Sequence, residues 1–313
     1  MKTTIFANCL ATVLAAGLAS FTGTAEAANL YMAVQGGATG GWQQWDTQTG
    51  QFVLRSSFGG VDLKVVTSGS LVYNTDLSGI IRLSSTDGSL INQNFITPSN
   101  GGYGLAISGN VLYSSGGSGL VSSWDATTGA SINASFISGL NGPDTMLVSG
   151  SSLYVAEVGG QKISQWDAVT GQVINSSLVS GFAAYGLAIS GNRLFASNYG
   201  SDAVGVFDLA TGSVIDANFI TGVPTPKGLA VEGSTLYVAS CDTGNYIGTY
   251  NVNTGATINS QYMQIDGGPN GLFIAPPSSV PEIDPNSLGS VLALVLGSLG
   301  LLERRRPQLT ATA

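Results

Sequence analysis

Short runs of alternating apolar and polar residues recur along the chain, and residues 152–178 contain one complete set of them. Alternation with a period of two is typical of β-strands. The pattern predicts three strands here, over residues 153–157, 163–167 and 172–178, with a tight turn at Thr170-Gly171 before the third. A preceding segment of the type GLAISG supplies a fourth. One unit of chain is therefore expected to form a four-stranded sheet.

The unit occurs six times at a nearly constant spacing. Its first marker is an aromatic residue that recurs every 40 to 42 residues: Tyr31, Tyr73, Tyr113, Tyr154, Phe195 and Tyr237. A second marker is an Asp or Asn that opens a D-x-x-T-G-like turn: Asp46, Asp125, Asp167, Asp208 and Asn251. A third is the polar residue of an Ile-Asn or Ile-Asp pair: Asn92, Asn133, Asn175, Asp216 and Asn259. A period of about 40–45 residues with four strands per unit is typical of a β-propeller.

The turn marker has a direct physical explanation. An Asp or Asn side chain can accept a hydrogen bond from the backbone N–H two residues further on and so close a turn. The glycine that ends the motif supplies the positive φ that a hairpin bulge needs. The second repeat, at residues 83–88, lacks the leading Asp. It counts as a repeat because its other two markers keep their spacing.

The order of the strands predicts how the ring closes. The propeller is expected over residues 28–276, beginning at Asn29 with the second strand of a blade. Residues 270–274 match the innermost strand of the other repeats and have no blade of their own. We therefore expect an all-β, six-bladed β-propeller of four-stranded blades, in which this C-terminal inner strand completes the N-terminal blade. Closure of this kind also hides sheet edges.

Composition supports an all-β fold and excludes several functions. The 313 residues include 44 glycines and only 9% charged residues, with a formal net charge of −8. An acidic chain without a basic stripe argues against nucleic-acid binding. The chain contains no histidine, which excludes Ser-His-Asp and Cys-His catalysis and histidine-based zinc sites. No phosphate-binding glycine loop or dinucleotide fingerprint is present.

The N-terminal residues 1–27 resemble a secretory signal peptide. Lys2 precedes an apolar run, and Ala25-Glu26-Ala27 offers a small-x-small cleavage site. Removal of this segment with Cys9 leaves Cys241 as the only cysteine, so no intramolecular disulfide is expected. We expect Cys241 to be a buried small apolar residue, with a reactive thiol as the alternative.

The C-terminal region has three parts. A linker with the motif Pro-Glu-Ile-Asp-Pro occupies residues 277–287, an uncharged segment with an arginine cluster occupies 288–306, and a tail occupies 307–313. This layout resembles a PEP-CTERM sorting signal, which implies an exosortase-type processing enzyme as a partner and at least transient contact with a membrane. The alternative is a permanent anchor, although the 15 apolar residues 288–302 are fewer than the ~20 of a usual spanning helix. Both alternatives place the propeller outside the cytoplasm, at the cell surface or in the extracellular matrix.

The Trp-Asp pairs at Trp45, Trp124 and Trp166 are followed by x-x-T-G, which resembles the blades of NHL-type and quinoprotein-type propellers. The resemblance covers residues 29–276 and implies a fold. We expect these tryptophans to pack within the blades.

A binding site is expected at the channel mouth, where the inner strands begin and the second strands end. One ring there comprises the residues before each GLA-type position: Leu63, Tyr103, Asp144, Tyr185, Lys227 and Asn270. A second ring comprises the residues three after each repeat aromatic: Val34, Asp76, Gly116, Glu157, Asn198 and Ser240.

Asp144, Glu157 and Asn198 come from neighbouring blades and carry the oxygen ligands that Ca²⁺ prefers. Propellers of the gluconolactonase family use a similar carboxylate-and-amide site. The alternative is that these residues are solvated side chains around a wet channel mouth.

Three functions compete. The first is an exported, non-catalytic propeller that binds polysaccharide or surface proteins, with no cofactor, and in which the exposed aromatics Tyr103 and Tyr185 stack on sugars. The second is a divalent-metal-dependent lactonase-like hydrolase or a lyase acting through Asp144, Glu157 and Asn198. The third, a quinone-dependent oxidoreductase, rests on the turn motif alone. We favour the first.

Overall fold

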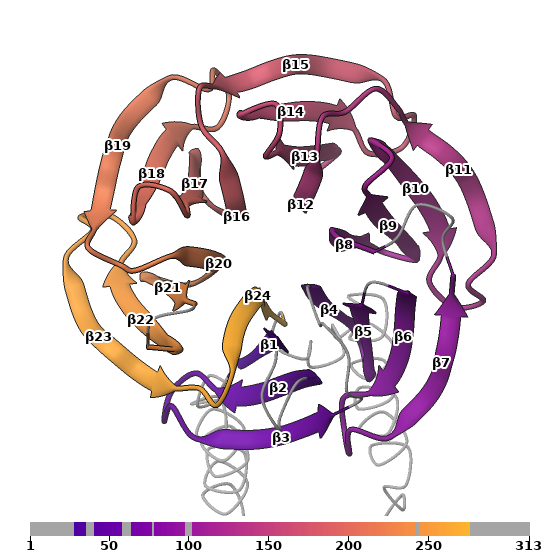
Figure 1. The fold of residues 1–313 in the computed structure, drawn as a ribbon, viewed down its shortest axis with the longest axis horizontal. Coiled ribbons are helices and arrows are strands. Elements are labelled where there is room, and N and C mark those ends of the chain that lie inside the picture. Colours follow the sequence, from indigo (N-terminus) through magenta and orange to yellow (C-terminus); the bar gives the residue numbers. More distant parts are fainter. Residues whose placement is uncertain are drawn as a thin grey trace, which may run out of the picture. The chain divides into compact units, whose positions relative to one another are not determined.

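The computed structural model describes residues 28–35, 41–57, 64–76, 78–97, 102–241 and 244–275, which form 24 β-strands. The strands make six four-stranded antiparallel sheets arranged as blades around a common axis (Figure 1). This confirms the predicted six-bladed β-propeller. No helix within the described ranges is long and apolar enough to cross a membrane.

Each blade contributes one strand to each of four concentric positions. The inner strands are β4 (Lys64–Ser68), β8 (Leu105–Ser108), β12 (Pro143–Ser149), β16 (Ala184–Ser190), β20 (Pro226–Glu232) and β24 (Gly268–Ile274). The second strands are β1 (Asn29–Gln35), β5 (Leu71–Asp76), β9 (Val111–Gly116), β13 (Ser152–Glu157), β17 (Arg193–Asn198) and β21 (Thr235–Ser240). The third strands are β2 (Gly41–Asp46), β6 (Gly79–Ser84), β10 (Leu120–Asp125), β14 (Lys162–Asp167), β18 (Ala203–Asp208) and β22 (Tyr246–Asn251). The outer strands are β3 (Phe52–Ser57), β7 (Leu90–Ile96), β11 (Ser131–Ile137), β15 (Val173–Ser180), β19 (Val214–Thr221) and β23 (Thr257–Gln264).

The predicted ring closure is confirmed. β24, the last strand of the chain to be described, pairs antiparallel with β1, with Leu30 opposite Ile274 and Met32 opposite Leu272. The first blade therefore has the order β24-β1-β2-β3 and joins the two ends of the propeller. Every other blade is formed by four consecutive strands.

The cores lie between neighbouring blades. The second and third strands are buried on both faces, as in β17 and β18, because a blade packs against each side of them. One cluster joins Phe195 and Val204 of one blade to Leu236 and Val238 of the next. Apolar residues therefore occupy successive positions in these strands, instead of alternate ones only. Cys241 is buried, as expected.

The D-x-x-T-G turns form as predicted. Asp167 Oδ1 accepts the backbone N–H groups of Val169 at 3.0 Å and Thr170 at 2.7 Å, and the Thr170 hydroxyl at 2.8 Å. In the second blade Ser84 replaces the aspartate, and its Oγ accepts the N–H of Thr86 at 3.2 Å. Because hydrogen bonds favour the charged carboxylate, they hold the pKa of Asp167 below its usual value.

The repeat aromatics fix one blade to the next. Tyr113 Oη donates a hydrogen bond of 2.6 Å to the carbonyl oxygen of Ala168, in the turn of the following blade. Burial raises the pKa of the Tyr113 hydroxyl, so the hydroxyl stays protonated and remains a donor. Phe195 lacks a hydroxyl, and in its blade the guanidinium of Arg193 donates to Val252 O at 3.1 Å instead.

The structure of the outer strands explains why an asparagine recurs as the third marker of the repeat. Asn175 Oδ1 accepts the backbone N–H of Ser177 at 3.0 Å, at a point where the pairing of β14 with β15 shifts register. The same local bond recurs at Asn133 and Asn259. A bulge of this kind bends an edge strand and hinders its pairing with another edge. The Asn side chains therefore shape the outer rim of the ring.

The three Trp-Asp tryptophans pack within the blades, as expected. Trp45, Trp124 and Trp166 are half-buried against core clusters, and the Trp166 indole N–H donates to Ser164 Oγ at 2.9 Å. The predicted segments 1–27, 277–287, 288–306 and 307–313 lie outside the described residues and stay predictions.

Candidate functional site at the channel mouth

The inner strands of all six blades enclose a central cavity of about 210 Å³. Its walls are largely aliphatic, with Leu105, Met146, Leu187, Leu229 and Leu272 at equivalent positions of five blades. All six inner strands start at the same end of the channel. The residues at their beginnings therefore gather around one opening, as the two predicted rings require, and this opening is called the mouth below.

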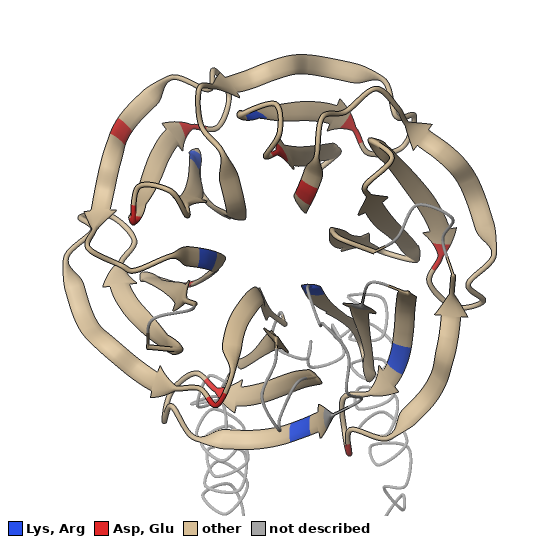
Figure 2. Ribbon diagram, in the orientation of Figure 1, with Lys and Arg blue, Asp and Glu red and all other residues tan. Residues whose placement is uncertain are grey.

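Charged side chains on the inner strands include two lysines and one aspartate at this end. Figure 2 shows basic residues on β4 and β20 and an acidic residue on β12, and these are Lys64, Lys227 and Asp144. Polar chemistry at the mouth therefore depends on very few groups.

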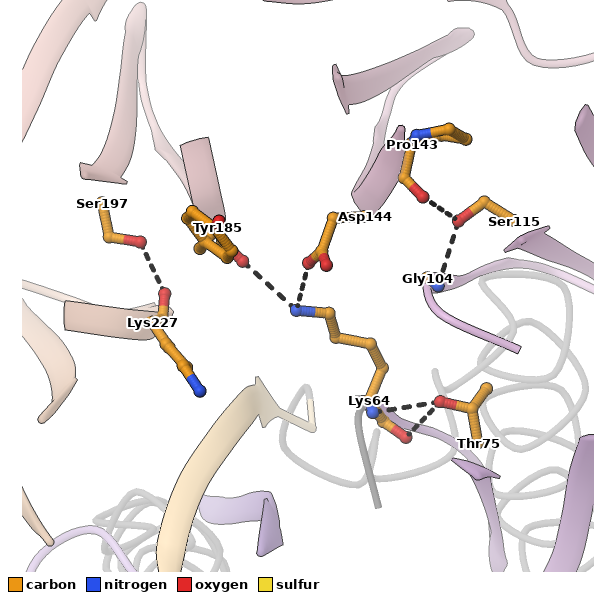
Figure 3. A network of polar contacts seen from close by, with 9 residues as sticks. All are labelled: Lys64, Thr75, Gly104, Ser115, Pro143, Asp144, Tyr185, Ser197 and Lys227. Carbon is orange, nitrogen blue, oxygen red and sulfur yellow. Dashed lines mark hydrogen bonds and ion pairs between the residues drawn. The ribbon is translucent and has the colours of Figure 1, made fainter. Parts of the chain in front are cut away.

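Lys64 crosses the channel from β4 to β12 and β16 (Figure 3). Its ammonium lies 3.0 Å from Asp144 Oδ1 and donates a hydrogen bond of 3.2 Å to the Tyr185 carbonyl oxygen. The Lys64 side chain is only 8% exposed, against 28% for Asp144. The pair links blades that are not sequence neighbours and neutralises the aspartate at the mouth.

Sequence reasoning missed Lys64, although the sequence carried a signal for it. Lys64 occupies the inner-strand position that is glycine in four other blades, at Gly104, Gly186, Gly228 and Gly271. A Cβ at Gly228 would lie 2.7 Å from the Asn270 carbonyl oxygen, so glycine permits a close approach of adjacent inner strands. A lysine in this row breaks the packing pattern and points to a separate role.

Hydroxyl groups complete the frame of the mouth. Ser115 Oγ accepts the Gly104 N–H at 3.0 Å and donates to Pro143 O of the next blade at 3.0 Å. Ser197 Oγ likewise donates to Lys227 O of the next blade at 2.6 Å. These bonds fix the beginnings of adjacent inner strands relative to one another.

The three predicted metal ligands each have other partners. Asp144 pairs with Lys64, as described above. Glu157 is buried, accepts the Asn141 N–H at 2.9 Å and the Ser164 hydroxyl at 2.8 Å, and lies 3.3 Å from Lys162 Nζ. Asn198 Oδ1 accepts the Gly200 N–H at 3.1 Å and closes its own turn.

Both carboxylates are thus held by lysines, and a metal ion would have to replace those contacts. Within the described part of the chain, no three His, Cys, Asp or Glu side chains group as metal ligands. The calcium site stays a prediction.

The aromatic residues of the first ring differ in exposure. Tyr103 is 39% exposed. Tyr185, expected to be exposed, is half-buried because its ring packs against Tyr199, with ring centroids 5.4 Å apart at 45°. Lys227 extends over the other ring of this pair, with Nζ 5.6 Å from the Tyr199 centroid. Neither Tyr199 nor its contact with Lys227 was predicted.

The other predicted ring positions are mostly structural. Val34 and Asn270 are buried, and Ser240 donates to Pro224 O at 2.8 Å. Leu63 and the side chain of Asp76 lie outside what the structure describes.

Fold and channel together define a six-bladed β-propeller. No protein-family model and no curated protein matches the chain. Among solved structures, a chain in the crystal structure of a nidogen/laminin complex matches with a TM-score of 0.67 at 16% identity, over 80% of this chain and 99% of that one. The computationally designed Ika8 protein matches with a TM-score of 0.50 at 15% identity, over 82% and 92%. At such identities the likeness concerns the fold alone, and the NHL-type and quinoprotein-type resemblance stays a prediction beyond it.

Proposed function

We propose that the chain is an exported, non-catalytic β-propeller that binds a polysaccharide of the cell surface or extracellular matrix at the mouth. The observation that carries the proposal is the exposed ring of Tyr103, which comes just before the inner strand β8 at the mouth. The paired rings of Tyr185 and Tyr199 lie two blades further along the chain. Tyrosine offers an apolar face for a sugar ring and a hydroxyl for hydrogen bonding. The propeller chain found with laminin supports the use of this fold in binding a macromolecule.

The state of the carboxylates favours binding over catalysis. Asp144 and Glu157 are each engaged by a lysine, at 3.0 Å and 3.3 Å. A general base needs a carboxylate that can reach a substrate proton. In this arrangement the carboxylates serve the frame of the mouth, while the tyrosines present their rings.

Binding of the full chain to immobilised polysaccharides tests the proposal. We expect Tyr103→Ala to weaken binding by about tenfold, the effect of roughly 1.4 kcal/mol. The matched control is Phe52→Ala, because Phe52 is 46% exposed on the outer strand β3, away from the mouth. Equal binding by the two variants would contradict the proposal. So would turnover of a substrate that is lost in Asp144→Ala.

Export has its own test. Mass spectrometry of the chain recovered outside the cells is expected to find an N-terminus at Ala28 and a C-terminus upstream of residue 288. An intact chain retained in the cytoplasm would refute the proposed location.

A further inference from the structure

The mouth contains a compact group of two tyrosines and a lysine from adjacent blades. Tyr185 belongs to β16, Tyr199 follows β17, and Lys227 belongs to β20. The two rings lie 5.4 Å apart between centroids, and the Lys227 ammonium lies 5.6 Å from the Tyr199 centroid. The group, called the Tyr185–Tyr199–Lys227 cluster below, combines two aromatic rings with a cation.

The two lysines at the mouth differ in their electrostatic state. Lys64 is paired with Asp144 at 3.0 Å, so its charge is neutralised locally. The ion pairs among the described residues are Lys64–Asp144 and Lys162–Glu157, and neither includes Lys227. Figure 3 shows the Lys227 ammonium apart from the Lys64–Asp144 pair. Lys227 is therefore a cation at the mouth that has no carboxylate partner among the described residues.

The cluster is held in place before any ligand arrives. The Lys227 carbonyl oxygen accepts the Ser197 hydroxyl at 2.6 Å. The Tyr185 carbonyl oxygen accepts the Lys64 ammonium at 3.2 Å. Gly186 allows the two inner strands to approach, because a Cβ there would overlap the Lys227 carbonyl oxygen. A site with a fixed backbone loses less conformational entropy when it binds.

We infer that the Tyr185–Tyr199–Lys227 cluster is a subsite for an acidic sugar, one that carries a carboxylate. The sugar ring packs against the tyrosines, and the carboxylate forms a charge-assisted hydrogen bond with Lys227. This inference rests on the proposed function and adds the class of polysaccharide. The net charge of −8 opposes an anionic ligand only weakly. Charges beyond a Debye length of about 8 Å are screened at physiological ionic strength, whereas a contact pair is not.

The test compares two forms of one polymer with the full chain. Polygalacturonate carries a carboxylate on each sugar, and its carboxyl-reduced form carries a neutral hydroxymethyl group instead. We expect the chain to prefer polygalacturonate and Lys227→Gln to weaken that binding about fivefold or more. Lys227→Arg should retain most of the affinity. Arg55→Gln is the matched control, since it removes the same charge from the exposed outer strand β3.

The outcomes separate this inference from the proposed function. Loss of the preference for polygalacturonate in Lys227→Gln, with unchanged binding to the reduced polymer, supports the acidic-sugar subsite. Equal effects of Lys227→Gln and Arg55→Gln overturn the subsite, and the proposed function survives if Tyr103→Ala still weakens binding to the reduced polymer. Binding of neither polymer nor any other polysaccharide overturns both.

Discussion

Gly171→Ala should destabilise the propeller far more than the matched change Gly181→Ala in the same blade. Both glycines have almost the same backbone conformation, with φ of +71° and +72°. A Cβ at Gly171 would lie 2.5 Å from the Phe136 carbonyl oxygen in the outer strand of the preceding blade. A Cβ at Gly181 would meet nothing within 4 Å. The pair therefore separates the cost of positive φ from the cost of a clash between blades.

The size of each effect follows from these values. An alanine forced into the left-handed region costs about 1–2 kcal/mol, and both variants carry this cost. At Gly171 the Cβ must also gain about 0.9 Å to reach an ordinary contact of 3.4 Å with a backbone atom. Overpacking of this kind costs about 1–3 kcal/mol more. We expect Gly171→Ala to lose about 2–5 kcal/mol of unfolding free energy and Gly181→Ala about 1–2 kcal/mol.

Thermal unfolding of the full chain measures the difference. A change of 1 kcal/mol moves the Tm by about 2–4 °C in a domain of 150–250 residues. The Tm of Gly171→Ala should thus lie several degrees below the Tm of Gly181→Ala. Gly129 and Gly139, with φ of +75° and +79°, repeat the comparison in the preceding blade. Equal Tm values for Gly171→Ala and Gly181→Ala, and for Gly129→Ala and Gly139→Ala, would mean that the turn glycines are needed only for their positive φ. The inferred close approach between blades would then be wrong.

Three further predictions use other contacts of the ring. Tyr113→Phe removes the hydroxyl donor to Ala168 O and should cost about 1 kcal/mol in urea unfolding, and an unchanged midpoint would show that this bond does not hold the blades together. Hydrogen bonds lower the pKa of the turn aspartates such as Asp167, and they lower the pKa of Asp87, the fourth residue of the second blade's turn, to about 2, so their stabilisation is complete above the unfolded value near 4. It is lost as the pH falls through the folded values. Asp167→Asn should therefore make the acid unfolding below about pH 4, measured by circular dichroism, less steep, and an identical acid limb would refute this origin. The calcium hypothesis predicts that added Ca²⁺ raises the Tm by mass action and that Glu157→Gln abolishes the rise, and it fails if neither Ca²⁺ nor EDTA changes the Tm.

The repeated rows of the sequence predicted nearly all of the ring. Asp167 and the residues after it fix a local turn, because its side chain bonds N–H groups only two and three residues away. Such contacts depend on sequence neighbours and can be read directly from the chain. The ring closure followed from counting inner strands, and β24 pairs with β1 as that count required.

The candidate site was harder to predict because its contacts join distant parts of the chain. Lys64 reaches Tyr185 across 121 residues, and no local pattern specifies that approach. The predicted rings placed Asp144 and Glu157 at the mouth, and the structure has them at the beginning of β12 and the end of β13. The rings did not predict that each carboxylate pairs with a lysine. The Lys64–Asp144 contact joins two non-adjacent blades and has no local signal. Lys162, by contrast, lies directly opposite Glu157 in the β13–β14 hairpin, so the hairpin register carried a signal for that pair.

Residues that recur in most blades and residues that occur in one blade have different physical reasons. A D-x-x-T-G turn or a Tyr113-type bond recurs in most blades, so its repetition is explained by construction of the ring. Lys64 interrupts a row of glycines, and its backbone N–H bonds to Thr75 Oγ1 at 3.1 Å as the Gly104 N–H bonds to Ser115 Oγ, so this shared contact does not need the lysine side chain. Lys227 adds a charge at a position that is tyrosine, aspartate or asparagine in four other blades. Because construction does not require these side chains, the departures from the repeat are where a binding function of this propeller should be sought.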